Sequence, residues 1–259
     1  MVFDPIERGR RVEAAVCRDD LARKYYRFRP SRFYGGSSVA DAVGCNLSCV
    51  FCWSWRANSR PSEVGRFYYP QDVGERLLRI AEARGYRIVR VSGGEPTLCW
   101  DHLISLLEYL HNRVGRGEVF ILETNGIVIG EEPSRARELA RFDRLLVRVS
   151  IKGCSPQTFS RVTGADARYW FSQLRALDNL IRSGVAARPA LVASFCSDDD
   201  VTQFLAKLRE VDPELPSLLE LEYTILYPSV RERLRRAGLR PRVAVDPRTW
   251  SLVRGFGSS

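Results

Sequence analysis

Short β-like runs alternate with longer helical runs through most of the chain, and this alternation restricts the possible fold more than any other feature. Apolar residues at helical spacing predict the helices, and short apolar runs between them predict the strands. We expect strands near Ser38–Gly44, Ile88–Val91, Val119–Glu123, Leu145–Ile151, Pro189–Phe195 and Leu218–Leu226. We expect helices at Pro70–Arg84, Trp100–Arg113, Ser134–Phe142, Tyr169–Arg182 and Asp198–Val211. Strands separated in this way by helices predict a parallel sheet with right-handed crossovers.

Two of the expected helices also carry signals at their ends. Gly85 stands where a glycine commonly ends a helix, and Ser197 stands where a serine side chain commonly begins one. In parallel sheets the functional groups gather at the carboxyl ends of the strands. We therefore predict one α/β domain at residues 37–228, with its sheet closed or partly closed into a barrel. Basic extensions would precede it at residues 1–36 and follow it, as a helix and tail, at residues 229–259.

The composition agrees with a globular protein of one domain, or at most two. The chain has 259 residues, of which 45% are apolar and 27% are charged, so it can form a large core without a disulfide framework. Its first residues are charged and lack the apolar run of a signal peptide, and no apolar segment is long enough to span a membrane. We expect a cytoplasmic protein without membrane contact.

The net charge of +9 is concentrated at the two ends of the chain. Residues 1–36 hold nine Lys and Arg against five Asp and Glu, and residues 229–259 hold eight against two, which leaves residues 37–228 at −1. One interpretation is a general preference for arginine, and the other is a basic surface that binds a polyanion. Aromatic and basic residues alternate over residues 24–34, which suits either stacking on single-stranded nucleic acid or packing against the first strand.

Three cysteines follow the first expected strand at the spacing C-x3-C-x2-C: Cys45, Cys49 and Cys52. Thiolates on a short loop are typical ligands of iron–sulfur clusters. Three of them can hold three corners of a four-iron cluster and leave one iron open. The alternatives are three buried structural cysteines, or a zinc site that lacks one ligand. A zinc site is awkward because both histidines, His102 and His111, lie on an expected helix.

This segment resembles the signature of the radical S-adenosylmethionine (radical SAM) superfamily, in which an aromatic residue, here Phe51, precedes the third cysteine. Three later strand ends carry further similarities. Gly93-Gly94-Glu95-Pro96 resembles the GGEP motif of the family, and Glu123-Thr124-Asn125-Gly126 resembles its ETNG or DTNG segment. Ser150-Ile151-Lys152 falls where some relatives carry a polar pair that binds the cofactor.

The resemblance covers about residues 38–226 and implies a partial (β/α)6 barrel. It implies that Cys45, Cys49 and Cys52 bind a [4Fe-4S] cluster and that S-adenosylmethionine (SAM) binds the open iron. Reductive cleavage of SAM would form a 5′-deoxyadenosyl radical that abstracts hydrogen from a substrate, with electrons from a reduced ferredoxin or flavodoxin. The implied SAM contacts are Phe51 near the adenine, Gly93, Gly94 and Glu95 at the methionyl amine, and Thr124, Ser150 and Lys152 at the ribose and carboxylate.

Within the superfamily, the chain most resembles the activating enzymes of glycyl-radical proteins, although Ser150 and Glu123 each replace an Asp of those relatives. The substrate stays open among a protein partner, RNA bound by the basic termini, and a small molecule. A non-catalytic iron–sulfur carrier is the weakest alternative, because a carrier does not need an amine-binding turn. The remaining cysteines are expected to be small buried apolar residues: Cys17, Cys99, Cys154 and Cys196.

Overall fold

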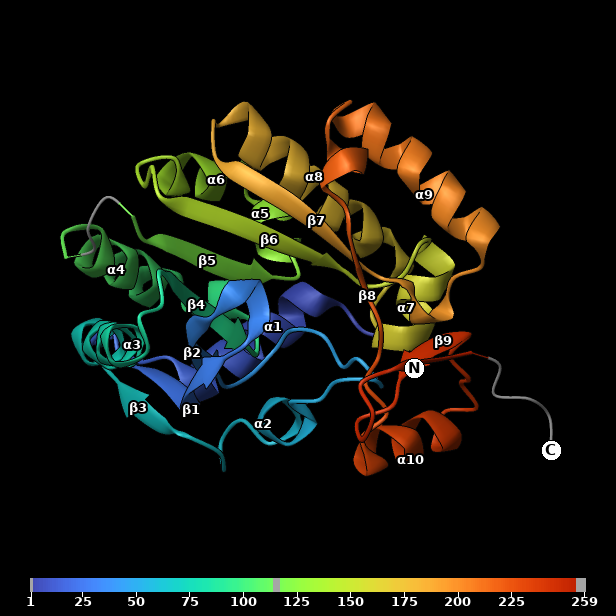
Figure 1. The fold of residues 1–259 in the computed structure, drawn as a ribbon, viewed down its shortest axis with the longest axis horizontal. Helices are drawn as coiled ribbons and strands as arrows, with labels where there is room; N and C mark the ends of the chain where they lie inside the picture. Colours follow the sequence, from blue (N-terminus) through green and yellow to red (C-terminus); the bar gives the residue numbers. More distant parts are fainter. Residues whose placement is uncertain (1, 114–116, 255–259) are drawn as a thin grey trace.

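A computed structural model describes residues 2–113 and 117–254 of the chain. Within these residues, one large sheet has eight strands in the order β3-β1-β2-β4-β5-β6-β7-β8 (Figure 1). Its strands are β1 Arg23–Ser31, β2 Ser37–Ala42, β3 Arg66–Tyr68, β4 Ile88–Gly93, β5 Val119–Thr124, β6 Leu145–Ile151, β7 Ala186–Val192 and β8 Glu220–Glu222. A second, small sheet pairs β9 Val243–Val245 with β10 Leu252–Arg254.

Most of the helices connect strands and cover the outer face of the curved sheet, whereas α2 and α10 lie away from it (Figure 1). Their bounds are α1 Pro5–Val16, α2 Trp55–Ser59, α3 Pro70–Arg84, α4 Trp100–His111, α5 Ile127–Glu131, α6 Pro133–Leu139, α7 Pro156–Thr163, α8 Trp170–Arg182, α9 Asp198–Val211 and α10 Pro228–Arg236. No helix among the described residues is both long and apolar enough to cross a membrane.

The expected α/β fold is confirmed, with a sheet that is mostly parallel. Strands β2, β4, β5, β6, β7 and β8 pair in parallel, each with the next. Strand β6 and helix α9 have the expected bounds, and Ser197 caps α9 by accepting a hydrogen bond from the Asp200 amide. Closure of the sheet into a partial barrel stays a prediction.

Two of the expected strands end well before their expected carboxyl ends, Phe195 and Leu226. Strand β7 ends at Val192 because residues 193–195 form a 3₁₀ turn, and β8 is limited to Glu220–Glu222. Helix α5 was not expected, since it has only five residues. It packs closely on α8, where a side chain at Gly130 would overlap the Ser172 carbonyl. These differences lie in the loops that border the carboxyl edge of the sheet.

The N-terminal segment takes part in the main sheet. Strand β1 pairs antiparallel with β2 on one side and with β3 on the other. Tyr25 on β1 is 2% exposed and packs with Phe28 and Tyr68 in the largest apolar core. Tyr25 and Phe28 of residues 24–34 therefore pack inside the protein, as the packing interpretation requires, and are not free to stack on nucleic acid. The domain boundary at residue 36 is still a prediction.

The C-terminal segment builds a second, smaller apolar core. Helix α10 contributes the buried Val230 and Leu234, and Gly238, at φ +62°, follows the helix. Val50 and Phe51 of the cysteine segment pack against this core. Residues 255–259 of the expected tail lie outside the described part of the chain.

The buried His102 makes the stability of the fold depend on pH. Its Nδ1–H donates to the Leu21 carbonyl at 2.7 Å, and in the neutral ring Nε2 accepts from the Tyr25 hydroxyl at 2.9 Å. Burial lowers the pKa of His102 from 6.5 to about 3. Between these values the unfolded chain binds a proton that the folded protein does not, and stability falls as the pH drops.

We expect His102 to account for a loss on the order of 1 kcal/mol per pH unit as the pH falls from 6.5 toward 3. The free energy of unfolding, measured with urea at pH 7 and pH 5, should change less with pH in the His102→Gln variant than in wild type. His111→Gln, at a ring that is only partly buried (37% exposed), is the matched control. An identical pH dependence in wild type and His102→Gln would contradict this prediction.

Candidate active site

The cysteine segment follows β2 and is held against the end of α7. The amides of Ser48 and Val50 donate to the carbonyls of Thr163 and Val162 at 3.1 and 2.9 Å. Gly44, at φ +86°, turns the chain where a side chain would meet Val12 of α1 at 2.6 Å. The segment is therefore anchored on both sides, and its three thiols are free.

Amide groups point toward two of the three sulfur atoms. The Leu47 amide donates to Cys45 Sγ at 3.4 Å, and Asn58 Nδ2 donates to Cys52 Sγ at the same distance. Asn125 Nδ2 lies 3.9 Å from Cys45 Sγ. Such donors stabilise thiolates, and they set the potentials of iron–sulfur clusters when the thiolates bind iron. The donor set therefore fits a cluster.

Burial makes the three thiols poor acids by themselves. It raises the pKa of Cys49 to about 12, and it raises the pKa values of Cys45 and Cys52 as well. Buried thiolates of this kind need a bound cation to compensate their charge. Among the described residues, no three His, Cys, Asp or Glu side chains converge as one metal ion would require. A zinc site would need a fourth Cys or His ligand, whereas a multi-iron cluster attaches each thiolate to a different iron.

The Gly-Gly-Glu-Pro turn packs directly on the chain that leads into the cysteines. The amides of Gly94 and Glu95 donate to the carbonyls of Ala42 and Gly44 at 2.8 and 2.7 Å. A side chain at Gly94 would overlap the Gly44 carbonyl, and Gly93 has φ +92°. The two glycines therefore allow the ends of β2 and β4 to approach each other.

Glu95 joins the ends of β4 and β5. Its carboxylate is buried, with the residue 1% exposed, and accepts hydrogen bonds from the Thr124 hydroxyl at 2.6 Å and the Asn125 amide at 2.7 Å. The hydroxyl and amide of Thr97 also donate to it. Thr124, expected at the ribose or carboxylate of SAM, is thus a direct partner of Glu95.

Arg23 holds the same turn from the opposite side. This arginine of β1 is 1% exposed and donates to the carbonyls of Glu95 and Pro96 at 2.7 and 2.6 Å. In the sequence, Arg23 is distinguished only as one of the basic residues of the N-terminal segment. No local signal could reveal its role, because its partners lie more than 70 residues away.

Ser150 and Lys152 lie beside a carboxylate that the sequence analysis missed. The Ser150 hydroxyl donates to Glu222 Oε2 at 2.9 Å and accepts from Lys152 Nζ. Arg148 donates to Glu222 Oε1, also at 2.9 Å. Burial alone would raise the pKa of Glu222, but Arg148 and Lys152 hold it below its ordinary value. The available signal was Glu220-Leu221-Glu222, which places two carboxylates on one face of the last strand.

Gln173 is a second missed residue, and it connects two loops of the site. Its fully buried amide donates to the carbonyls of Asn125 and Ser150 at 2.7 and 3.0 Å and accepts from the Lys152 amide at 3.1 Å. Gln173 therefore holds the carboxyl ends of β5 and β6 together through hydrogen bonds to both. The Phe51 ring packs beside that of Phe195, with ring centroids 5.8 Å apart.

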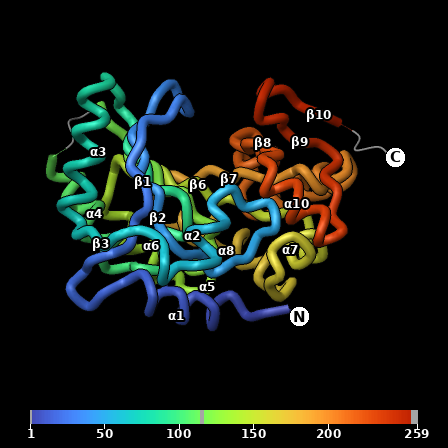
Figure 2. Tube along the Cα trace, turned by 90° about the horizontal axis from the view of Figure 1, so that it is seen from below, coloured from blue at the N-terminus to red at the C-terminus, as the bar shows by residue number. Residues whose placement is uncertain are grey.

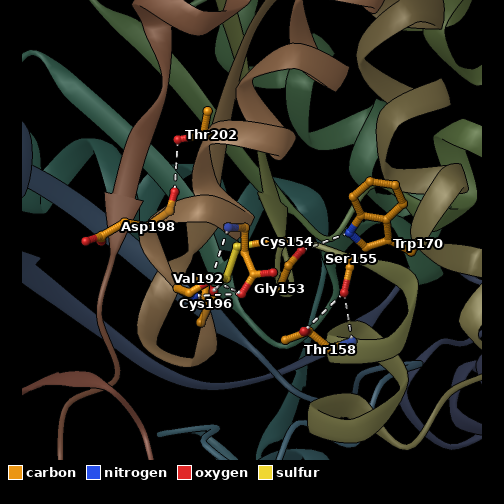
Figure 3. The surroundings of a disulfide bond; sticks show 11 residues. Gly153, Cys154, Ser155, Thr158, Trp170, Val192, Cys196, Asp198 and Thr202 are labelled. Carbon is orange, nitrogen blue, oxygen red and sulfur yellow. Dashed lines mark hydrogen bonds between the residues drawn. A yellow bond between two sulfur atoms is a disulfide. The ribbon is translucent and has the colours of Figure 1, made fainter. Parts of the chain in front are cut away.

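The four other cysteines form two disulfides, so their prediction as free apolar residues was wrong. Cys17 is bonded to Cys99, and Cys154 is bonded to Cys196, with Cα separations of 5.7 and 6.1 Å. Figure 3 shows the second bond between the loops that follow β6 and β7. The error arose because sequence separations of 82 and 42 residues hide the pairs. Disulfides are rare in the cytosol, with the intracellular proteins of hyperthermophiles as an exception.

We expect each disulfide to contribute about 2–4 kcal/mol to the free energy of unfolding. The Cys154→Ser/Cys196→Ser and Cys17→Ser/Cys99→Ser double variants should each unfold at lower temperature, measured by calorimetry without reductant. Thiol titration of the denatured, unreduced apoprotein should detect only Cys45, Cys49 and Cys52. Titration of all seven cysteines would refute the pairing.

Comparison with known proteins decides the family. The model of the radical SAM superfamily matches residues 40–195, which is more than half of the chain and includes the cysteine segment and the Gly-Gly-Glu-Pro turn. The chain belongs to the radical SAM superfamily. It is therefore an enzyme, and the cofactors of this family are a [4Fe-4S] cluster and SAM.

Similar curated proteins are named GTP 3′,8-cyclases. The chain is 30% identical over 125 residues to the probable cyclase of Thermoplasma volcanium, covering 48% of this chain and 35% of that protein. It is 33% identical over 122 residues to that of Methanothermobacter thermautotrophicus, with coverages of 47% and 36%. This radical SAM chain thus spans about a third of the length of these relatives. Neither of the two is named as a glycyl-radical activating enzyme, the type that the sequence most resembled.

Among solved structures, SuiB of Streptococcus suis bound to the precursor peptide SuiA has a similar fold. Its TM-score is 0.53 at 20% identity, over 67% of this chain and 36% of SuiB. SuiB bound to S-adenosylmethionine gives a TM-score of 0.51 at 22% identity, over 65% of this chain and 36% of that one. At these identities the likeness supports the radical SAM fold alone.

Proposed function

We propose that the protein cleaves SAM reductively and uses the resulting radical to abstract hydrogen from a substrate. The observation that carries this proposal is that three free thiols and the buried Glu95 lie at the ends of neighbouring strands. Amide groups donate to two of the three thiols. When bound, the cluster and SAM supply a 5′-deoxyadenosyl radical, and an external donor of the ferredoxin or flavodoxin type supplies the electron.

In this proposal the side chains of the chain bind and orient the cofactors. Cys45, Cys49 and Cys52 hold the cluster, and Glu95 accepts hydrogen bonds from the methionyl amine beside Gly93 and Gly94. Phe51 borders the adenine. Lys152 and Ser150 contact the ribose or carboxylate, with Glu222 keeping Ser150 in place. Thr124 orients Glu95 through its 2.6 Å hydrogen bond.

Anaerobically reconstituted protein tests the proposal directly. With dithionite and SAM it should form 5′-deoxyadenosine, measured by liquid chromatography and mass spectrometry, and omission of dithionite is the matched control. A protein that binds iron but forms no more 5′-deoxyadenosine than the control would refute the proposed reaction.

Charged pairs between strands of the large sheet favour a small polar substrate. Arg90 pairs with Glu123 at 2.7 Å, and Arg148 pairs with Glu220 and Glu222 at 2.7 and 2.9 Å. Cyclases of GTP, a small polar molecule, are the named relatives of the matching region. A protein partner, as in activation of a glycyl-radical enzyme, is the weaker proposal because these relatives are named as cyclases.

RNA is a further candidate substrate because of the basic ends, but several of their arginines already pair with groups of this chain. Arg23 donates to backbone carbonyls, and Arg235 and Arg236 pair with Glu232 at 3.0 and 2.6 Å. RNA recognition requires tRNA affinity that falls steeply between low and physiological salt. Affinity that is absent or independent of salt would exclude it. Cytoplasmic localisation stays a prediction.

A further inference from the structure

Arg233 of helix α10 reaches across to the cysteine segment. Its Nε donates to the Val50 carbonyl at 3.1 Å, and its Nη2 donates to the Cys52 carbonyl at 2.5 Å. Its guanidinium also lies 4.9 Å from the centre of a Trp55 ring at the start of α2. Figures 1 and 2 both show α10 beside the chain around α2, although about 180 residues separate the partners.

The apolar face of α10 packs on the same segment. Val230 and Leu234 are buried in the smaller apolar core, to which Val50 and Phe51 contribute. Arg233 lies between these two positions in the sequence, at the edge of the contact. The helix therefore holds Val50 and Phe51 by apolar packing, while its arginine holds the carbonyls on either side of Phe51.

Arg233 differs from the neighbouring arginines in its partners. Arg235 and Arg236 are exposed and pair with Glu232. Within residues 2–113 and 117–254, no carboxylate lies within ion-pair distance of Arg233. Backbone carbonyls of an irregular segment need donors, and a guanidinium offers two in a rigid fork. The basic C-terminal segment thus uses one of its charges beside the expected cluster.

We propose that Arg233 is a positioning residue that keeps Cys52 and Phe51 in place for the cluster and SAM. This inference rests on the proposed function. The two hydrogen bonds restrain the segment that holds the third cysteine, and the positive charge favours the reduced, more negative cluster. Arg233 therefore affects cluster retention, cluster potential and the KM for SAM without touching the reacting atoms.

Three variants test this role. Arg233→Met keeps most of the apolar stem but removes the charge and both donors, and Arg233→Lys keeps the charge but not the fork. Arg236→Met is the matched control on the same helix, because Arg236 is exposed and pairs only with Glu232 among the described residues. Each variant is reconstituted anaerobically and compared with wild type.

Iron loss to a chelator, the cluster midpoint potential and the KM for SAM are measured on the reconstituted proteins. Hydrogen exchange of residues 48–53 is measured on the apoproteins, which keeps a readout independent of the cluster. Arg233→Met should lose iron about tenfold faster, since a charged hydrogen bond contributes at this level. Its potential should be more negative, its KM higher and its exchange faster. Arg233→Lys should keep the wild-type potential but lose iron faster, and Arg236→Met should match wild type.

Wild-type values for both Arg233 variants in all four measurements would overturn the inference. Equal changes in Arg233→Met and Arg236→Met would also overturn it, because they would indicate a general effect of charge removal. If Arg233→Met does not fold, the Arg233→Lys variant tests the inference through its rates of iron loss and of hydrogen exchange. If wild type itself forms no cluster and cleaves no SAM, the proposed function fails, and this outcome is distinct from failure of the Arg233 variants.

Discussion

The Cys49→Ala variant is expected to lose the [4Fe-4S] cluster and to form no 5′-deoxyadenosine above background. Cys49 is the central cysteine of the C-x3-C-x2-C segment and is buried, so water could not easily take the place of its thiolate on a cluster. The expected loss is at least about a thousandfold in the rate of SAM cleavage, because the reaction needs the bound cluster. Iron content, visible absorbance and 5′-deoxyadenosine yield are the measurements.

The Cys17→Ser/Cys99→Ser variant is the control for Cys49→Ala. It removes two sulfur atoms that are bonded to each other and are not proposed ligands. It should keep the cluster and unfold at lower temperature. If wild type and Cys49→Ala gave equal trace yields of 5′-deoxyadenosine, the three cysteines could not be assigned as the ligands of a catalytic cluster.

Replacing Glu95 by glutamine is expected to lower kcat/KM for SAM by about a hundredfold or more. In the structure Glu95 accepts hydrogen bonds on both carboxylate oxygens, from Thr124 and Thr97 on one and from the Asn125 amide on the other. A glutamine would place an NH2 group against one of these donors, and it would lose the charge that binds an ammonium group. The unpaired buried donor should also cost about 1–3 kcal/mol of stability.

Thr97→Val separates the structural effect of Glu95→Gln from the effect on SAM. It removes one donor to the same carboxylate but keeps the negative charge. We expect it to lower stability while SAM binding, measured by calorimetry on the reconstituted protein, stays within about threefold of wild type. If Glu95→Gln binds SAM as tightly as Thr97→Val does, Glu95 does not bind the methionyl amine.

Local patterns were enough to predict most of the sheet and the segments at its carboxyl edge. Strand β6 and helix α9 were predicted to the residue, because apolar periodicity and the Ser197 cap are properties of neighbouring residues. The cysteine segment and the Gly-Gly-Glu-Pro turn were found for the same reason, since their spacing is short. Strand β8 was placed less well, because only three of its residues pair with β7.

Contacts between distant residues could not be predicted in this way. Cys17 with Cys99, Ser150 with Glu222 and Arg233 with Cys52 are separated by 82, 72 and 181 residues. The sequence around one residue of each pair does not identify its partner. The charge count showed that both ends of the chain are basic, but it could not show that Arg23 and Arg233 donate to carbonyls of the site.

The sequence by itself determined the parallel α/β order and the superfamily, and it predicts that the three thiols bind a cluster, because these inferences depend on periodicity and short motifs. Only the tertiary structure decided which side chains support them: Glu222 beside Ser150, Gln173 between two loops, and one arginine from each basic end. The physical reason is that buried carbonyls and carboxylates need hydrogen-bond donors. Folding supplies these donors from residues that are distant in the sequence.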